Sequence, residues 1–113
     1  MNHRDIEPIL KEFTTSLVRA LGPALKRVLL FGSYARGEAG PDSDIDVLVV
    51  VEGNGSTREQ VIDVAADVSL KYSVVLAPLI RTASAWRRLE ATQAPITQSI
   101  AREGIVLWPN PTS

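Results

Sequence analysis

The chain has 113 residues, of which 45% are apolar and 22% are charged, with a net charge of −1 and no cysteine. These values predict one globular domain with a modest core, too short to add a large second substrate domain. They exclude a disulfide framework and a thiolate metal site, and the near-neutral charge argues against a protein that works on long nucleic acid.

The first predicted elements are a helix over residues 5–21 and a strand over residues 28–31. Asp5 is the expected N-cap, and the glycine-proline pair at 22–23 ends the helix. The apolar residues of this helix follow one-face spacing, which predicts that they cover one face of a sheet: Ile6, Ile9, Leu10, Phe13 and Leu17.

Gly32 and Ser33 follow that strand directly and predict a phosphate site. Gly32 has no Cβ, so its backbone can turn sharply and approach a ligand closely. Ser33 is a good helix N-cap, and residues 34–36 fit the first turn of a short helix whose free N–H groups face an anion. Arg36 supplies a further positive charge. The Gly/Pro segment 37–41 then turns the chain back, so that the next strand can lie beside the first.

Two carboxylates mark the start of the next strand. Residues 44–51 are largely β-branched and form a run too short for a typical helix, which predicts a strand. Because side chains alternate along a strand, Asp44 and Asp46 share one face, and the apolar residues between and after them point to the other. Two crowded carboxylates repel each other and favour a hard divalent cation. Mg²⁺ completed by substrate phosphates is the usual solution.

A polar loop over residues 52–56 leads to a helix over 57–70, which begins at the capping box formed by Thr57 and Gln60. A short apolar strand over 73–77 follows. Its continuous apolar character predicts a central position in the sheet.

Two helices and a last strand complete the chain. We expect a helix over residues 85–90 with Ser84 as its cap, and another over 95–102 that ends at Gly104. Residues 105–108 read as a strand at an edge of the sheet, because a proline follows at once.

The predicted fold class is therefore α/β: a single domain over residues 1–108, with a small mixed β-sheet of about four strands covered by helices, and a disordered tail over 109–113. No apolar run approaches membrane-spanning length, and the first residues lack a signal-peptide core. We therefore expect a cytoplasmic protein without a membrane partner.

A glycine-serine pair after a strand is, taken alone, a common turn, and Asp-x-Asp is often a solvated strand edge. Their combination is specific. Gly32-Ser33, ten intervening residues and Asp44-x-Asp46 resemble the signature of the DNA polymerase beta-type nucleotidyltransferase superfamily. The fuller string GSYARGEAGPDSDIDVLVV resembles the minimal nucleotidyltransferase (MNT) family.

The resemblance implies a nucleotidyltransferase fold that presents the two aspartates to a magnesium–nucleotide complex. It implies transfer of a nucleoside monophosphate, with AMP from ATP as the leading case, to a hydroxyl. Many MNT proteins are antitoxins of HEPN-domain toxins, and some add AMP to a tyrosine of the toxin, so a HEPN-type partner is expected. A homo-oligomer is compatible with the sequence. The resemblance implies that Asp44 and Asp46 are catalytic and bind the metal. It also implies that the nucleotide is bound by Gly32, Ser33, Arg36, Asp44 and Asp46.

One departure from the superfamily pattern leaves alternatives open. A third carboxylate, on a later strand, completes the two-metal site in the superfamily, and residues 73–80 contain no Asp or Glu. An acid from elsewhere in the chain, a partner acting in trans, or weak turnover would each account for this. The candidate acids are Asp63, Asp67, Glu90 and Glu103.

Three functions follow, in order of preference. The first is an enzyme that modifies a partner protein. The second is a catalytically weak or inactive nucleotide-binding antitoxin or adaptor that acts by contact. The third, a stand-alone drug-modifying nucleotidyltransferase, is disfavoured because nothing in the sequence builds a second substrate pocket.

Overall fold

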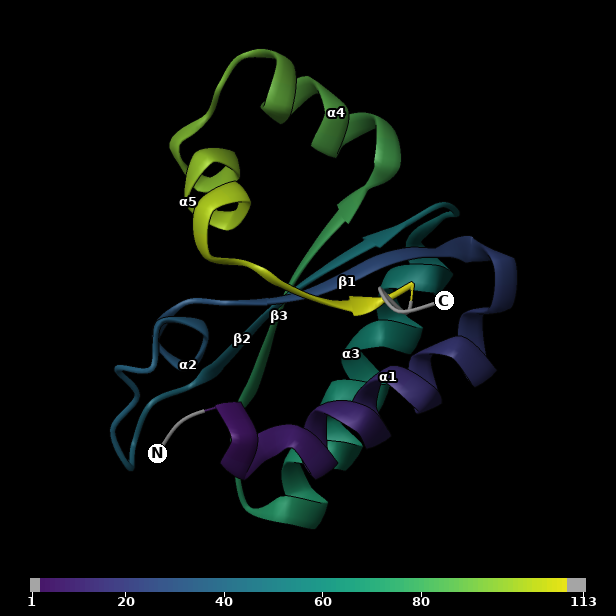
Figure 1. The fold of residues 1–113 in the computed structure, drawn as a ribbon. Helices are drawn as coiled ribbons and strands as arrows, with labels where there is room; N and C mark the ends of the chain where they lie inside the picture. The colour runs from purple at the N-terminus through teal and green to yellow at the C-terminus, as the bar shows by residue number, and fades with distance from the viewer. Residues whose placement is uncertain (1–2, 110–113) are drawn as a thin grey trace.

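The computed structural model describes residues 3–109, which form a four-stranded sheet with helices on both faces (Figure 1). In chain order the elements are η1 (His3–Ile6), α1 (Glu7–Leu21), η2 (Gly22–Ala24), β1 (Leu25–Phe31), α2 (Ser33–Arg36), β2 (Ile45–Val51), α3 (Gly55–Tyr72), β3 (Leu76–Thr82), α4 (Ala83–Ala91), α5 (Pro95–Glu103) and β4 (Ile105–Trp108).

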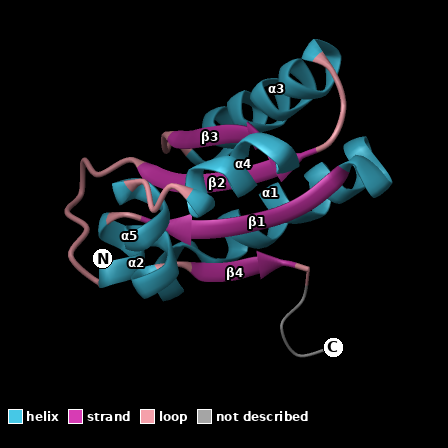
Figure 2. Ribbon diagram, turned by 90° about the horizontal axis from the view of Figure 1, so that it is seen from above, coloured by secondary structure: helices cyan, strands magenta, loops and turns pink. Residues whose placement is uncertain are grey.

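The strand order across the sheet is β3-β2-β1-β4, and Figure 2 shows the four strands side by side in this order. β1 pairs antiparallel with both β2 and β4, whereas β2 and β3 are parallel. The parallel pair is possible because α3 carries the chain back across the sheet between the two strands. The predicted mixed α/β sheet is confirmed.

Alternation along β2 separates the two faces of the sheet. Ile45, Val47 and Val49 are fully buried in a core that also contains apolar residues of α1 and α3. Leu48 and Val50 point the other way and pack with residues of α4 and α5. Figure 1 shows α1 and α3 on one side of the sheet and α4 and α5 on the other. Asp46 therefore belongs to the face that α4 and α5 cover.

The predicted helices are present, but the N-caps of α1, α3 and α4 differ from expectation. The N-cap of α1 is Ile6 rather than Asp5, because a 3-10 turn precedes the helix. In α3 the cap is Asn54, whose Oδ1 accepts from Ser56 N–H, so the helix starts before Thr57, which is buried. In α4, Thr82 rather than Ser84 accepts the capping bond, from Ala85 N–H. In α3, Asn54 is also a favourable N-cap residue, and it caps the helix three residues before the predicted Thr57.

The third strand was predicted in the wrong place. Ser73 is the C-cap of α3, in a left-handed conformation with φ 55°, so the predicted strand start instead ends a helix. β3 begins at Leu76 and continues to Thr82, and it lies at an edge of the sheet rather than at its centre. The strand is apolar because β2 lies along one of its edges and α3 covers one of its faces. It is not flanked by strands on both edges. β4 occupies the other edge, as predicted.

Within residues 3–109, no helix is both long and apolar enough to cross a lipid bilayer. Residues 110–113 of the predicted tail lie outside the described part of the chain.

Candidate active site

The two predicted metal ligands lie where β2 begins. Asp44 is the exposed residue directly before the strand, and Asp46 is its half-buried second residue, paired across the sheet with Phe31. A turn holds the approach to this strand: Ser43 Oγ accepts from Gly40 N–H at 2.9 Å, and Ser43 N–H donates to Gly40 O at 3.2 Å.

The glycine of the predicted phosphate site lies directly against the second aspartate. Gly32 follows the last residue of β1 and has φ +77°, a conformation that L side chains rarely adopt. A Cβ at this position would overlap Asp46 Oδ2 and would lie 3.1 Å from Asp46 Cγ. The absence of a side chain at Gly32 is therefore what allows the backbone and the carboxylate to share one location.

The surroundings of Asp46 raise the pKa of its carboxyl group. Burial raises the pKa of this carboxyl above its ordinary value, the Asp44 carboxylate raises it further, and the Arg36 guanidinium partly opposes both. The three predicted residues therefore lie close enough to act on one another. A carboxylate that is costly to ionise alone gains from a neighbouring cation, which is the expected electrostatic state of a metal ligand before its ion binds.

The segment after Gly32 is one helical turn, α2, as predicted, but its cap differs. Gly32 itself occupies the N-cap position and Ser33 is the first helical residue, with no side-chain capping bond. Ser33 is half-buried, and its backbone oxygen accepts from Glu38 N–H at 2.9 Å. Gly37 closes the turn in a left-handed conformation.

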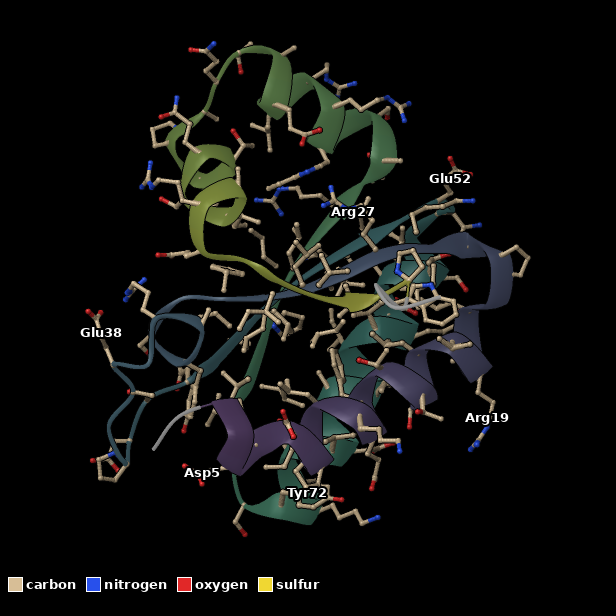
Figure 3. The ribbon with its side chains drawn as sticks, in the orientation of Figure 1. Asp5, Arg19, Arg27, Glu38, Glu52 and Tyr72 are labelled. Carbon is tan, nitrogen blue, oxygen red and sulfur yellow. The ribbon has the colours of Figure 1, made fainter. Side chains whose placement is uncertain are left out.

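Arg36 is held by two carboxylates. Its Nε donates to Glu38 at 2.8 Å, and its Nη1 donates to Glu103, at the end of α5, at 3.1 Å. These bonds raise the pKa of the guanidinium, first through Glu38 and then through Glu103. Figure 3 shows Glu38 at the α2 end of the molecule and Glu52 at the opposite end of the sheet. Arg36 is thus fixed beside the aspartates by a residue far along the chain.

The donor set fits a magnesium ion that arrives with its nucleotide. Two carboxylates are the usual protein contribution to a Mg²⁺ that also takes phosphate oxygens and water. Among residues 3–109 there is no group of three or more His, Cys, Asp or Glu side chains able to hold an ion. Asp44 and Asp46 could therefore supply only part of a coordination shell, and a substrate would have to complete it.

The sequence profile of the nucleotidyltransferase domain family matches residues 10–94, which include Gly32, Ser33, Arg36, Asp44 and Asp46. The chain belongs to the nucleotidyltransferase domain family.

Two relatives of this nucleotidyltransferase come from Methanocaldococcus jannaschii. The protein named "Putative protein adenylyltransferase MJ0141" is 41% identical over 78 residues, which cover 67% of the chain and 79% of the relative. MJ0604, which carries the same description, is 31% identical over 102 residues, covering 90% of the chain and 97% of the relative.

Solved structures show the same fold at low identity. A crystal structure of a toxin–antitoxin with AMP-PNP matches with a TM-score of 0.61 and 21% identity, covering 90% of this chain and 75% of that one. A nucleotidyltransferase of Sulfolobus solfataricus matches with a TM-score of 0.60 and 21% identity, covering 91% and 79%. A chain from the complex of a tri-AMPylated Shewanella oneidensis HEPN toxin with its MNT antitoxin matches with a TM-score of 0.53 and 19% identity, covering 89% and 71%.

The strand beside Asp46 supplies no third carboxylate. In the parallel register, Asp46 pairs with Ala77 on β3, so Ala77 shares its face of the sheet, and β3 contains no Asp or Glu. Asp63 and Asp67 are exposed on α3, which packs on the opposite face, so neither reaches the pair from its own element.

The other two candidate acids lie on the α4/α5 face but differ in position. Glu90 is exposed near Arg27 and Trp86, toward the far end of β1 from Gly32. Glu103 approaches the site only through Arg36, whose charge it partly neutralises. The described chain therefore brings no third acid beside Asp44 and Asp46.

Sequence reasoning missed the part that Glu103 and Glu38 play. Glu103 lies 67 residues beyond Arg36, and a single glutamate at the end of a helix carries no local signal. Only the pairing of β4 with β1, which returns the end of α5 to the Gly32 bend, brings the two together.

Proposed function

We propose that this protein transfers AMP from Mg·ATP to a hydroxyl group of a partner protein. The observation that carries the proposal is the close approach of Gly32 to Asp46, which supports a single location where phosphate and a carboxylate-bound metal ion could meet. The description of the Methanocaldococcus relatives as protein adenylyltransferases supports the choice of adenylate and of a protein acceptor.

The residues take the following roles. Asp44 and Asp46 would hold Mg²⁺, which on binding offsets the charge of the triphosphate. Gly32 and Ser33 lie against the phosphates, and Arg36 adds positive charge beside them. The acceptor oxygen attacks the α-phosphorus, and the bond from this phosphorus to the bridging oxygen of the β-phosphate breaks. Pyrophosphate leaves, and the hydroxyl proton passes to solvent or to a nearby carboxylate. Positioning and charge stabilisation supply most of the catalysis.

The partner in this proposal is a HEPN-type protein, for which the chain acts as antitoxin. The proposal is supported by the fold shared with chains of toxin–antitoxin structures, one of which contains an AMPylated HEPN toxin. In this proposal the partner itself supplies the hydroxyl.

A second function has one specific observation in its favour. Because no third carboxylate lies beside Asp44 and Asp46 within residues 3–109, a nucleotide-binding antitoxin or adaptor with weak or no turnover is the alternative.

Incubation with Mg²⁺, ATP labelled on its α-phosphate, and the HEPN-type product of a neighbouring gene separates the two functions. The enzyme predicts label on that protein, which is lost with Asp44→Asn. The adaptor predicts tight binding without label, unchanged by the same substitution. A result with no label on the partner and no binding to it would contradict both functions.

A further inference from the structure

The face formed by α3 and β3 carries an unusual concentration of exposed apolar side chains. Within the described residues, four large hydrophobic residues are clearly exposed, and three of them lie here: Ile62, Leu70 and Val75, which expose 45%, 81% and 55% of their surface. Ile62, Ala66 and Leu70 recur every four residues along α3, so they form one row on its surface. We call this row together with Val75 the α3/β3 surface.

This surface extends to Asp44, one of the two acids of the candidate active site. Ile62 and Ala66 line a groove of about 350 Å³ between α3 and β3, and Ser69 lies at its end. Ser69 also lines a second groove of about 490 Å³, together with Leu70, Val75 and Asp44. A molecule lying along the first groove would therefore reach Asp44 through the second.

The edge of β3 is poorly suited to pairing with a partner strand. Ile45 N–H of β2 donates to Val75 O, so the backbone groups of Val75 face β2. Backbone groups alternate in direction along a strand, so those of Leu76, Pro78 and Ile80 face the free edge of the sheet. Leu76 N–H already donates to Ser69 Oγ, and Pro78 has no N–H. Ile80 O accepts from the Arg81 guanidinium at 2.8 Å. Blocked edges of this kind disfavour strand addition, so side chains rather than backbone must make the contact.

An acidic row borders the apolar one. Glu59, Asp63 and Asp67 are exposed and also recur every four residues along α3, and none of them forms an ion pair within residues 3–109. A second copy of this chain using the same surface would bring two such acidic rows together, which is unfavourable. The row instead complements a basic surface.

We propose that the α3/β3 surface docks a partner helix that carries an apolar stripe flanked by Lys or Arg, and that this helix belongs to the protein whose hydroxyl is presented to Asp44 and Asp46. The identification of that helix with the acceptor rests on the proposed function; the docking itself does not. The apolar row buries against the stripe of the helix, and the acidic row pairs with its flanking cations.

The test measures binding of the purified HEPN-type protein by calorimetry at two salt concentrations. Leu70→Ser combined with Val75→Ser should raise the dissociation constant at least tenfold, whereas the matched control Val106→Ser, at the exposed hydrophobic residue of β4, should not. Asp63→Lys combined with Asp67→Lys should weaken binding and reduce its salt dependence. The control Glu90→Lys makes the same charge change at one site on the α4/α5 face. It should neither weaken binding nor reduce its salt dependence.

Other results would overturn the proposal. Unchanged binding by the α3/β3 variants, or no binding by the unaltered chain, would exclude this surface as the docking site. A dimer of the chain alone that Leu70→Ser dissociates would make the occupant a second copy. New hydrogen-exchange protection of the Ile80 amide in the complex would indicate strand addition instead of a helix.

Binding of the partner and transfer of AMP can be lost independently of each other. The Asp44→Asn variant should bind the partner as the unaltered chain does, whether or not transfer occurs. Loss of transfer with intact, surface-dependent binding would leave the docking proposal standing and refute only the proposed function.

Discussion

The α1/α3 face of the sheet holds a continuous core to which α1, α3 and all four strands contribute. Among the described residues, the α4/α5 face has a smaller cluster of buried hydrophobic residues: Leu29, Leu48, Val50, Trp86 and Ile100. β2 supplies residues to both faces, and at its start the second face carries Asp46 in place of an apolar residue. The comparison indicates that stability is concentrated on one face, which leaves one end of the other available for charged groups. Substitutions on the two faces should therefore have separable effects.

The largest effect is expected in the α1/α3 core. Phe13 is fully buried, so Phe13→Ala should lower the free energy of unfolding by about 3–5 kcal/mol, a large part of the stability of a typical domain. Urea denaturation followed by circular dichroism measures this loss. Leu89→Ala, at a half-buried residue of the α4/α5 face, is the control and should cost less than half as much. Equal losses would contradict the unequal division of stability.

At Asp46 we expect a substitution to reduce activity and to increase stability. Asp46→Asn should reduce transfer at least about 100-fold, because a metal-binding carboxylate contributes several kcal/mol to the transition state. In the absence of metal the same variant should be more stable than the unaltered protein at neutral pH. Parallel assays of activity and thermal unfolding test both expectations.

The sign of that stability change follows from the raised pKa of Asp46. A carboxyl whose folded pKa lies above its ordinary value of 3.8 costs stability once it is ionised, and the cost appears as pH rises through the raised pKa. The advantage of Asp46→Asn should therefore be full at neutral pH and should shrink as pH falls toward 3.8. An advantage that grows in acid would contradict the origin assigned to the shift.

Gly32 tests the close approach that joins the two halves of the site. Gly32→Ala should lower the free energy of unfolding by about 1–3 kcal/mol and should also abolish nucleotide binding, since its Cβ displaces the Asp46 carboxylate. Gly37→Ala is a matched control, because Gly37 has φ +73° and nothing within 4 Å of a Cβ. It should show the strain without the loss of nucleotide affinity. Equal nucleotide affinities of the two variants would remove the support for a shared site.

The smallest effect is expected where α5 holds Arg36. Glu103→Gln should raise the KM for ATP about two- to fivefold with little change in kcat, because a partly exposed ion pair contributes modestly to the position of Arg36. Glu38→Gln should do less, since the Glu38 side chain is 66% exposed against 22% for Glu103. An effect on kcat alone would show that Arg36 does more than position the nucleotide.

The local parts of the site could be predicted from the sequence. Alternation along the strand that begins at Ile45 puts Asp46 on the face that α4 and α5 cover, with Asp44 directly before the strand. The Gly32 bend follows from a glycine after an apolar strand. Contacts between distant segments could not be predicted, because neither the Arg36–Glu103 pair nor the register of Ala77 beside Asp46 leaves a trace in local sequence.

The error at β3 has a specific cause. An apolar run of five residues is compatible with either a central strand or an edge strand covered by a helix, and the left-handed conformation of Ser73 is not encoded by a glycine. The edge position of β3 is nevertheless what exposes Val75 beside Asp44, so the misplaced strand is also the one that shapes the surroundings of the site.

The most direct test of the central claim is calorimetric titration of the protein with a non-hydrolysable ATP analogue, with and without Mg²⁺, alongside Asp46→Asn. We expect binding that requires Mg²⁺ in the unaltered protein and is lost in the variant. Equal affinity with and without Mg²⁺, or unchanged binding by Asp46→Asn, would contradict the assignment of the two aspartates and the Gly32 bend to one magnesium–triphosphate site.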